Sequence, residues 1–340
     1  MFTMKKIFSI FSLLLLTVSV CSQKIVVEDI YYQIKQNSYV EVTRGDQQYV
    51  GHVVIPSTVD YGGKTYPVTA IGGAAFRNAR SLRSVHIPEG VKSIGNNAFS
   101  GCRGLRRIDI PNSVALIGRS AFENCSSLQQ VVLPDTLSLL REKAFSGCSA
   151  LRYLSFSAAL DSIGEDAFVG CVGLDTVDYR GGLLDWCDIE FASLMANPVV
   201  LSGHLYMQGE QLVDLVTPDS LTVIKNYTFA GSSSLRSLVL SEGVTHVGDG
   251  ALAHCASLST LSVPTTLLTV GLDALVGDSL LESVVLHADS LEAYCRSQVN
   301  RQLKNAGATA SRILVIDSTV IRQVTIPAAI KRIPDYLFYG

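Results

Sequence analysis

A segment of 23 residues recurs along this chain, four times in succession without insertions or deletions. Its copies run over Ser81–Arg103, Gly104–Ser126, Ser127–Ser149 and Ala150–Val172, and the same register returns at Ser234–Ala256 and Ser257–Ser279. A fixed period of roughly 20–50 residues is the signature of stacked repeats, because one short turn cannot bury its apolar face alone whereas neighbouring turns build a continuous core. The period therefore predicts one elongated solenoid and argues against a doubly wound sheet or two globular domains.

The residue pattern within one copy indicates how each turn is built. Polar and apolar residues alternate over Ser84–Ile87, which is typical of a short strand with one buried face. Pro88 lacks an amide donor and is expected to end that strand. Further along, Ile94 should point inward, Gly95 permits a backbone corner, and Asn97–Phe99 is expected to form a tight helical or 3₁₀ turn. By the repeat register, we expect parallel strands at Ser84–Ile87, Arg107–Ile110, Gln130–Leu133 and Tyr153–Phe156.

Two residue types recur at fixed positions of the repeat and define columns of the predicted core. Phenylalanine stands at Phe76, Phe99, Phe122, Phe145, Phe168 and Phe229. A cysteine stands three positions after the phenylalanine, or after Leu252 at the same repeat position, at Cys102, Cys125, Cys148, Cys171 and Cys255. The cysteine column admits metal binding, disulfides between neighbouring turns, or buried free thiols that act as small hydrophobic groups. We favour free thiols, because one thiol per turn does not suit a metal and because Ala79 and Ser232 occupy the same position in other turns.

The whole motif, L-x-x-V-x-I-P-x-x-V-x-x-I-G-x-x-A-F-x-G-C, resembles the BspA-type leucine-rich repeat of bacterial surface proteins. The segment Tyr31–Gly72 resembles the N-terminal part of that family, and Tyr179–Pro218 resembles an interruption found in it. The resemblance implies a leucine-rich-repeat solenoid of short parallel β-strands. Members of the family are mostly secreted or surface-attached, and several are implicated in adhesion to host matrix proteins, to other cells or to other bacteria. The resemblance transfers no catalytic residues and no fixed binding motif.

The positions where the repeat register is lost divide the chain into segments. We expect a signal peptide at 1–22, an N-terminal cap with a β-hairpin at 23–67, leucine-rich repeats at 68–180, an inserted helix and hairpin at 181–216, leucine-rich repeats at 217–289, an inserted helix and strand at 290–320, and a partial repeat at 321–340. Gly62 and Gly63 suit the tight turn of the cap hairpin. The last turn is incomplete at Gly340, so we expect further repeats or a sorting domain beyond it.

The first residues predict export. Lys5 and Lys6 precede an uncharged stretch of 14 residues, which suits the core of a signal peptide and is short for a membrane span. We place cleavage after Ser22; the alternative is a lipid anchor on Cys21, although Val20 is a poor residue to precede a lipidated cysteine. No later segment has the ~18 uninterrupted apolar residues of a transmembrane helix, so we do not expect an integral helical membrane protein. The predicted location is secreted or at the cell surface.

Charge and residue content restrict the possible functions. Charged residues make up 17% of the chain and the formal net charge is −3, which gives no reason to expect a nucleic acid as partner. The motifs H-E-x-x-H, G-x-S-x-G and C-x-x-C are missing, and the six histidines are scattered. We therefore expect no enzyme activity, no cofactor and no bound metal.

One face of the predicted first strands carries basic and aromatic residues. Its members are Arg83, Arg106, Arg107, Gln130, Arg152 and Tyr153. Stacked turns bring such side chains about 4.8 Å apart per turn, so the arginines repel one another unless an anionic partner lies among them. Arginine and tyrosine are also frequent at binding hot spots. We predict that this face binds a ligand; the open alternative is that the arginines only solvate an exposed sheet.

These observations predict an adhesin-like interaction protein that binds a protein or polysaccharide on host or microbial surfaces through its solenoid face. The alternative is a periplasmic or surface glycan-binding protein in which Tyr153 and Trp186 stack on sugar rings. The tripeptide Arg44-Gly45-Asp46 also spells an integrin-recognition sequence, but its glycine and aspartate equally suit a turn between two strands.

Overall fold

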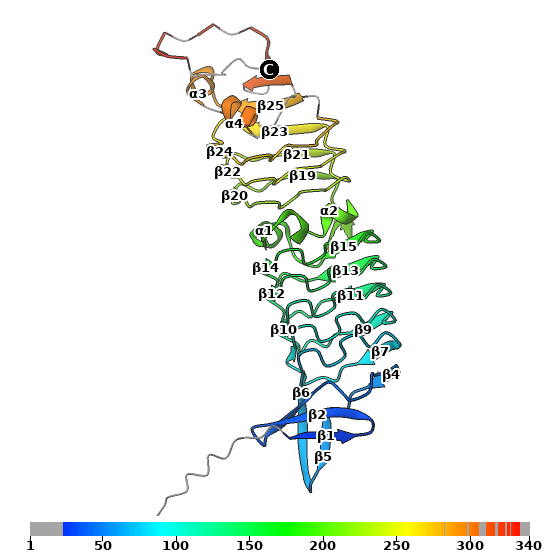
Figure 1. Cartoon of the computed structure of the whole chain (residues 1–340). Coiled ribbons are helices and arrows are strands. Elements are labelled where there is room, and N and C mark those ends of the chain that lie inside the picture. Colours follow the sequence, from blue (N-terminus) through cyan, green and yellow to red (C-terminus); the bar gives the residue numbers. More distant parts are fainter. Residues whose placement is uncertain are drawn as a thin grey trace, which may run out of the picture.

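The computed structural model describes residues 23–281, 283–297, 299–305, 311–316, 319–323, 325–326 and 328–333. The expected signal peptide and Cys21 lie outside the described residues, as do residues 334–340 of the last expected repeat. The described part forms an elongated stack of turns that runs from the N-terminal strands to the C-terminal helices (Figure 1). One continuous hydrophobic core extends through this stack from Ile25 to Leu303.

Six strands precede the repeats. They are β1 (Lys24–Val27), β2 (Ile30–Lys35), β3 (Tyr39–Val42), β4 (Gly51–Val54), β5 (Thr58–Tyr61) and β6 (Lys64–Ile71). Strands β1, β2 and β3 are antiparallel neighbours, and β3 pairs in parallel with β6. Strands β5 and β6 form a hairpin whose turn residues Gly62 and Gly63 have φ values of 60° and 76°. The end of β6 pairs in parallel with the first repeat, so this cap covers the open end of the core.

Each regular turn contributes two strands, and most of these pair in parallel with the corresponding strand of the next turn. After β4, the first strands of the turns are β7 (Leu82–His86), β9 (Arg107–Asp109), β11 (Gln130–Val132), β13 (Tyr153–Phe156), β15 (Thr176–Tyr179), β17 (Leu205–Met207), β19 (Asp214–Val216), β21 (Ser237–Val239), β23 (Thr260–Pro264), β25 (Ser283–Ala288) and β26 (Ser311–Ile316). We call this row the first ladder; neighbours in it pair in parallel except β9 with β11 and β17 with β19. Two short strands run antiparallel to members of it, β18 (Glu210–Gln211) on β17 and β27 (Thr319–Ile321) on β26.

The second strands are only two residues long and form a second ladder on another side of the solenoid (Figure 1). They are β8 (Ser93–Ile94), β10 (Leu116–Ile117), β12 (Leu139–Leu140), β14 (Ser162–Ile163), β16 (Glu190–Phe191), β20 (Val223–Ile224), β22 (His246–Val247) and β24 (Thr269–Val270). Within the described residues, helices occur only where the repeats are interrupted. They are α1 (Leu183–Asp188), the 3₁₀ helix η1 (Leu194–Ala196), α2 (Val199–Ser202), α3 (Leu291–Arg296) and α4 (Val299–Asn305).

The architecture confirms the predicted leucine-rich-repeat solenoid of parallel strands. The four predicted strands correspond to β7, β9, β11 and β13, with ends that differ by no more than two residues. The second ladder was not predicted, because a two-residue strand is too short to show an alternation of polar and apolar residues. Its backbone bonds exist only once turns stack, as between Gly95 N and Ile71 O at 2.8 Å.

The remaining side of each turn differs from the prediction of a helical or 3₁₀ turn at Asn97–Phe99. Asn97 has a left-handed backbone with φ of 56°, and so have the residues at the same position of the next three turns. A left-handed residue interrupts a helix. The segment instead forms separate tight turns, and the amide of Phe99 donates to the carbonyl of Ala121 in the following turn at 2.7 Å. Alternate amides bond within the segment, as Ala98 N does to Gly95 O at 3.2 Å, so single turns replace the expected helical or 3₁₀ segment.

The phenylalanine column is the central feature of the core. All six of its members are buried. The rings of Phe76, Phe99 and Phe122 lie nearly parallel, with centroids 4.8 Å and 5.1 Å apart, and the stack continues through Phe145 and Phe168 at 5.0 Å and 6.0 Å. The ring spacing is close to the ~4.8 Å between paired strands, so ring stacking and ladder pairing reinforce each other.

The cysteine column lies beside the phenylalanines and consists of buried free thiols. Each thiol donates to the carbonyl of the phenylalanine in the preceding turn. The Sγ–O distances are 3.0 Å for Cys102 to Phe76 and 3.2 Å for Cys125 to Phe99, Cys148 to Phe122, Cys171 to Phe145 and Cys255 to Phe229. Burial raises the pKa of Cys102 to about 12 and raises the pKa of Cys125 well above its usual value. These side chains therefore act as neutral donors that tie adjacent turns together.

Replacing Phe122 with alanine should destabilise the protein by about 3–5 kcal/mol, because the truncation leaves a cavity between two stacked rings. Chemical denaturation of the wild type and the Phe122→Ala variant measures this difference. Val132, whose side chain is 48% exposed on the first ladder, provides the control. The Val132→Ala change should stay within about ±0.5 kcal/mol, and equal effects of the two substitutions would contradict the role of the ring stack.

The thiols should be unreactive in the folded protein and all reactive after denaturation. Protein expressed without residues 1–22 contains the seven cysteines of the described residues. Since burial raises the pKa of the column thiols that carry a resolved shift, the thiolate fraction at pH 8 is small and a thiol reagent should react slowly. Denaturation without reductant should then reveal seven thiols. A titre that falls short of seven by an even number would show disulfides instead.

Asp278 occupies the cysteine position of its turn and makes the stability dependent on pH. Its Oδ1 accepts a bond from Cys255 N at 2.9 Å, whereas its buried Oδ2 has no partner among the described residues. Burial raises the pKa of Asp278 from 3.8 to about 7, so the folded state binds the proton more tightly than the unfolded chain. The free energy of unfolding should therefore fall as the pH rises between about 4 and 7.

The Asp278→Asn variant keeps the shape of the side chain and loses the charge. Its melting temperature should exceed that of the wild type by an amount that grows between pH 4 and pH 8. Asp214, exposed at the start of β19, is the control, and Asp214→Asn should show no such trend. A difference between Asp278→Asn and the wild type that is constant across pH would refute the assignment.

Candidate functional site

The six residues predicted to bind a ligand lie together on the first ladder; we call them the basic strand face. Arg83 lies in β7, and Arg106 and Arg152 directly precede β9 and β13 at the same repeat position. Backbone bonds link this position from turn to turn, from Arg106 N to Arg83 O at 3.1 Å and, through Gln129, from Arg152 N to Gln129 O at 2.8 Å. These three arginines are exposed and form no ion pair within the described part of the chain. At about 4.8 Å per turn, Arg83 and Arg106 are one step apart and Arg106 and Arg152 two steps apart.

The other members of the basic strand face have partners within the chain. The guanidinium of Arg107 lies 3.0 Å from the Asp109 carboxylate. The Tyr153 hydroxyl donates to Asp178 Oδ2 at 2.6 Å, and burial together with this bond raises the pKa of Tyr153. Gln130 is paired in register with Tyr153 and is exposed. The unsatisfied positive charge of this face therefore comes from Arg83, Arg106 and Arg152.

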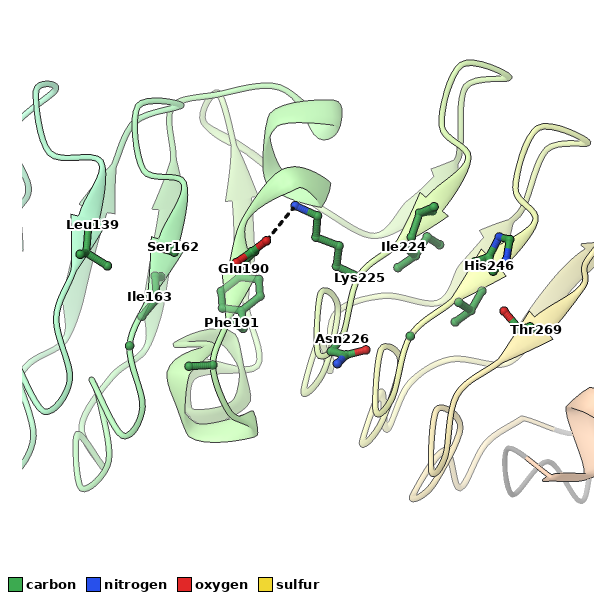
Figure 2. Close-up of a pocket in the computed structure, with 15 residues that line it drawn as sticks. Leu139, Ser162, Ile163, Glu190, Phe191, Ile224, Lys225, Asn226, His246 and Thr269 are labelled. Carbon is green, nitrogen blue, oxygen red and sulfur yellow. Dashed lines mark ion pairs between the residues drawn. The ribbon is translucent and has the colours of Figure 1, made fainter.

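A groove that the sequence did not reveal opens on the second ladder (Figure 2). Its volume is about 740 Å³. Its walls come from both repeat blocks, with Ile163 and Phe191 on one side and Ile224 and Val247 on the other. Leu139 and Val223, which are 39% and 44% exposed, add apolar surface at its margins.

The groove exists because the second ladder is interrupted. Strand β16 pairs with β14 and strand β20 pairs with β22, but β16 and β20 do not pair with each other. Lys225 spans the mouth of the groove: its Nζ donates to Asp188 O at 2.6 Å and lies 4.0 Å from the Glu190 carboxylate. The one signal in the sequence is that Phe168 and Phe229 are 61 positions apart, which is not a multiple of the 23-residue period.

Trp186 is not a platform for sugars, which corrects one of the sequence-based alternatives. Its side chain is completely buried, and its indole N–H donates to Thr228 O at 3.0 Å. The amide of Asn197 donates to the same carbonyl at 3.2 Å and to Tyr227 O at 2.7 Å. Together these side chains replace bonds that a regular preceding turn would supply, so Trp186 stabilises the junction of the two blocks.

The Arg44-Gly45-Asp46 tripeptide lies in the loop after β3. Both charged residues are exposed, and the Asp46 carboxylate forms an ion pair with Lys24 at 2.8 Å. Gly45 lies against the ring of Tyr31, where a Cβ would come within 2.4 Å of a ring carbon. The glycine is thus required by local packing, and the tripeptide is explained without a ligand.

The chain belongs to the BspA-type leucine-rich-repeat family. The model of the BspA type leucine rich repeat region matches residues 69–193 and 201–340, in six copies. No curated protein matches the chain. No helix in the described ranges is long and apolar enough to cross a membrane.

The solved structures to which the chain is similar include the following three proteins. A leucine rich cell surface protein from Faecalibacterium prausnitzii shares 17% identity, with 87% of this chain and 95% of that chain covered and a TM-score of 0.45. The leucine-rich repeat protein of T. pallidum shares 24% identity over 69% of this chain and 91% of its own, with a TM-score of 0.45. The pneumococcal vaccine antigen PcpA shares 16% identity over 86% and 99%, with a TM-score of 0.46.

Proposed function

We propose that the protein is a secreted or cell-surface interaction protein of adhesin type that binds an acidic protein or polysaccharide through the basic strand face. The observation that carries this proposal is the column of Arg83, Arg106 and Arg152, which are exposed and without carboxylate partners among the described residues. Membership of a family with many surface proteins and the predicted signal peptide support the location.

The geometry of the column favours an extended anionic ligand over a single small anion. Three guanidinium groups follow the solenoid axis at intervals of about one and two strand spacings. A linear ligand with repeated carboxylate or sulfate groups can contact all three and relieve their mutual repulsion. Asp109 offsets only Arg107, so the charge of the column remains for a partner.

Removing the three unpaired arginines should weaken binding to acidic polymers. We expect the Arg83→Ala, Arg106→Ala, Arg152→Ala triple variant to bind immobilised heparin and immobilised polyglutamate at least about ten-fold more weakly than the wild type. The wild-type affinity should fall with salt, because exposed charges are screened beyond about 8 Å at physiological ionic strength. Surface plasmon resonance at several salt concentrations measures both effects.

The matched control removes the same charge elsewhere. Arg77, Arg103 and Arg141 are exposed outside the basic strand face and form no ion pair among the described residues. Their triple alanine variant should bind like the wild type, and both variants should stay folded, since surface changes usually alter stability by no more than about 0.5 kcal/mol each. If the control variant loses binding equally, net charge alone is responsible and the proposed face is wrong.

A further inference from the structure

The interruption of the second ladder has a simple origin in the order of the strands. Each regular turn contributes a first-ladder strand and then a second-ladder strand, as in β15 followed by β16 and β19 followed by β20. Between these two turns, β17 joins the first ladder beside β15, but it is followed by β18, which returns antiparallel on β17. The turn that contains β17 therefore has no second-ladder strand, and the groove opens between the strands that would flank it.

The two edges of the groove carry backbone groups without partners. In regular turns the residue equivalent to Phe191 accepts a bond from the next turn, as Ile163 O does from Ala192 N at 3.0 Å and Ile224 O does from Gly248 N at 2.8 Å. Residues of a parallel ladder direct their backbone groups alternately to the two neighbouring strands. Four backbone groups consequently face the groove: the N–H and C=O of Phe191, the C=O of Val223 and the N–H of Lys225. Within the described residues none of these groups forms a hydrogen bond.

The shape and lining of the groove suit a polypeptide. Its volume of about 740 Å³ lies within the range of about 300–1,000 Å³ found for ligand sites. One residue of an extended chain, together with the peptide groups on either side of it, has the donors and acceptors to pair with all four of these backbone groups. Figure 2 shows Glu190 and Phe191 on one edge and Ile224 and Lys225 on the other, with the Lys225 side chain reaching across toward Glu190.

We propose that this groove binds an extended segment of a partner protein, which adds as a parallel strand between β16 and β20 and completes the second ladder. The central residue of the segment donates its N–H to Val223 O and accepts from Lys225 N. Phe191 N donates to the carbonyl of the residue before it, and Phe191 O accepts from the N–H of the residue after it. The site lies on a different surface from the basic strand face and does not depend on it.

The register also specifies which side chains fit. The central residue falls at the position of Ile94 and Ile163, whose side chains are buried, and the groove there is lined by Phe191 and Ile224, so an aliphatic side chain fits best. The next residue falls at the position of Gly95 and Gly164, where a Cβ would lie 2.6 Å from a backbone nitrogen of the preceding turn, although Arg141 and Ala192 stand at this position in other turns. The segment best suited to the groove is therefore an aliphatic residue followed by a glycine.

The probe is the capped peptide Ac-Thr-Lys-Ser-Ile-Gly-Thr-Thr-NH2. On the wild-type protein, saturating peptide should slow amide hydrogen exchange at Phe191 and Lys225, the two donors that face the groove. The same peptide with N-methyl groups on isoleucine and glycine loses both of its donors and should bind at least about ten-fold more weakly. Failure of millimolar peptide to protect these two amides, or equal binding of the methylated peptide, would overturn the proposal.

Two variants of one residue test the site from the side of the protein. Lys225→Pro removes the N–H that faces the groove, and Lys225→Ala removes the side chain but keeps that N–H. We expect Lys225→Pro to bind the peptide about ten-fold more weakly than Lys225→Ala, which lacks the same side chain, with circular dichroism confirming that both fold. If Lys225→Pro does not fold, the methylated peptide on the wild type still decides the question.

The triple arginine variant of the basic strand face separates the two proposals. It should bind the peptide like the wild type, because none of the arginines lies in the groove. Loss of peptide binding in that variant would place the peptide on the basic strand face and refute the groove. Self-association of the protein that is competed by the peptide would show that the bound segment belongs to a second copy of this chain and not to a different partner.

Discussion

The structure depends on hydrogen bonds between the backbones of adjacent turns. They run along the first ladder, the second ladder and the tight turns that carry the phenylalanines, so each turn is held to its neighbour on three sides. Their spacing sets the distance at which Phe99 and Phe122 stack and at which Cys125 reaches the carbonyl of Phe99. A solenoid of this kind is stabilised mainly by the interfaces between neighbouring turns.

The insertion between the two repeat blocks affects the core and the second ladder differently. In the core, Trp186 and Asn197 supply donors to Thr228 O, so this carbonyl has partners although no regular turn precedes it. On the second ladder no element takes the place of the missing strand, and the edges of β16 and β20 stay open to solvent. The same 38-residue excess over the period thus closes the core and leaves an unpaired strand edge on each side of the groove.

Two surfaces with different chemistry follow from this arrangement. The basic strand face presents side-chain charge at regular intervals, and its interaction with a partner is long-ranged and sensitive to salt. The groove presents backbone donors and acceptors, whose interaction is short-ranged and depends on an extended conformation of the partner. In Figure 1 the two ladders lie on different sides of the solenoid, so both surfaces can be occupied at once.

The sequence by itself determined the period, the solenoid and the four strands around Val85, Ile108, Val131 and Leu154, because a 23-residue repeat admits only stacked, equivalent turns. It also placed the arginines of one column on one face. Only the tertiary structure decided that Arg107 is neutralised by Asp109, that Trp186 is buried and that a second ladder exists with one strand missing. The Arg107–Asp109 pair is local and depends on the side-chain conformations within β9. The burial of Trp186 and the second ladder depend on contacts between turns, and the residue pattern of a single turn carries no record of them.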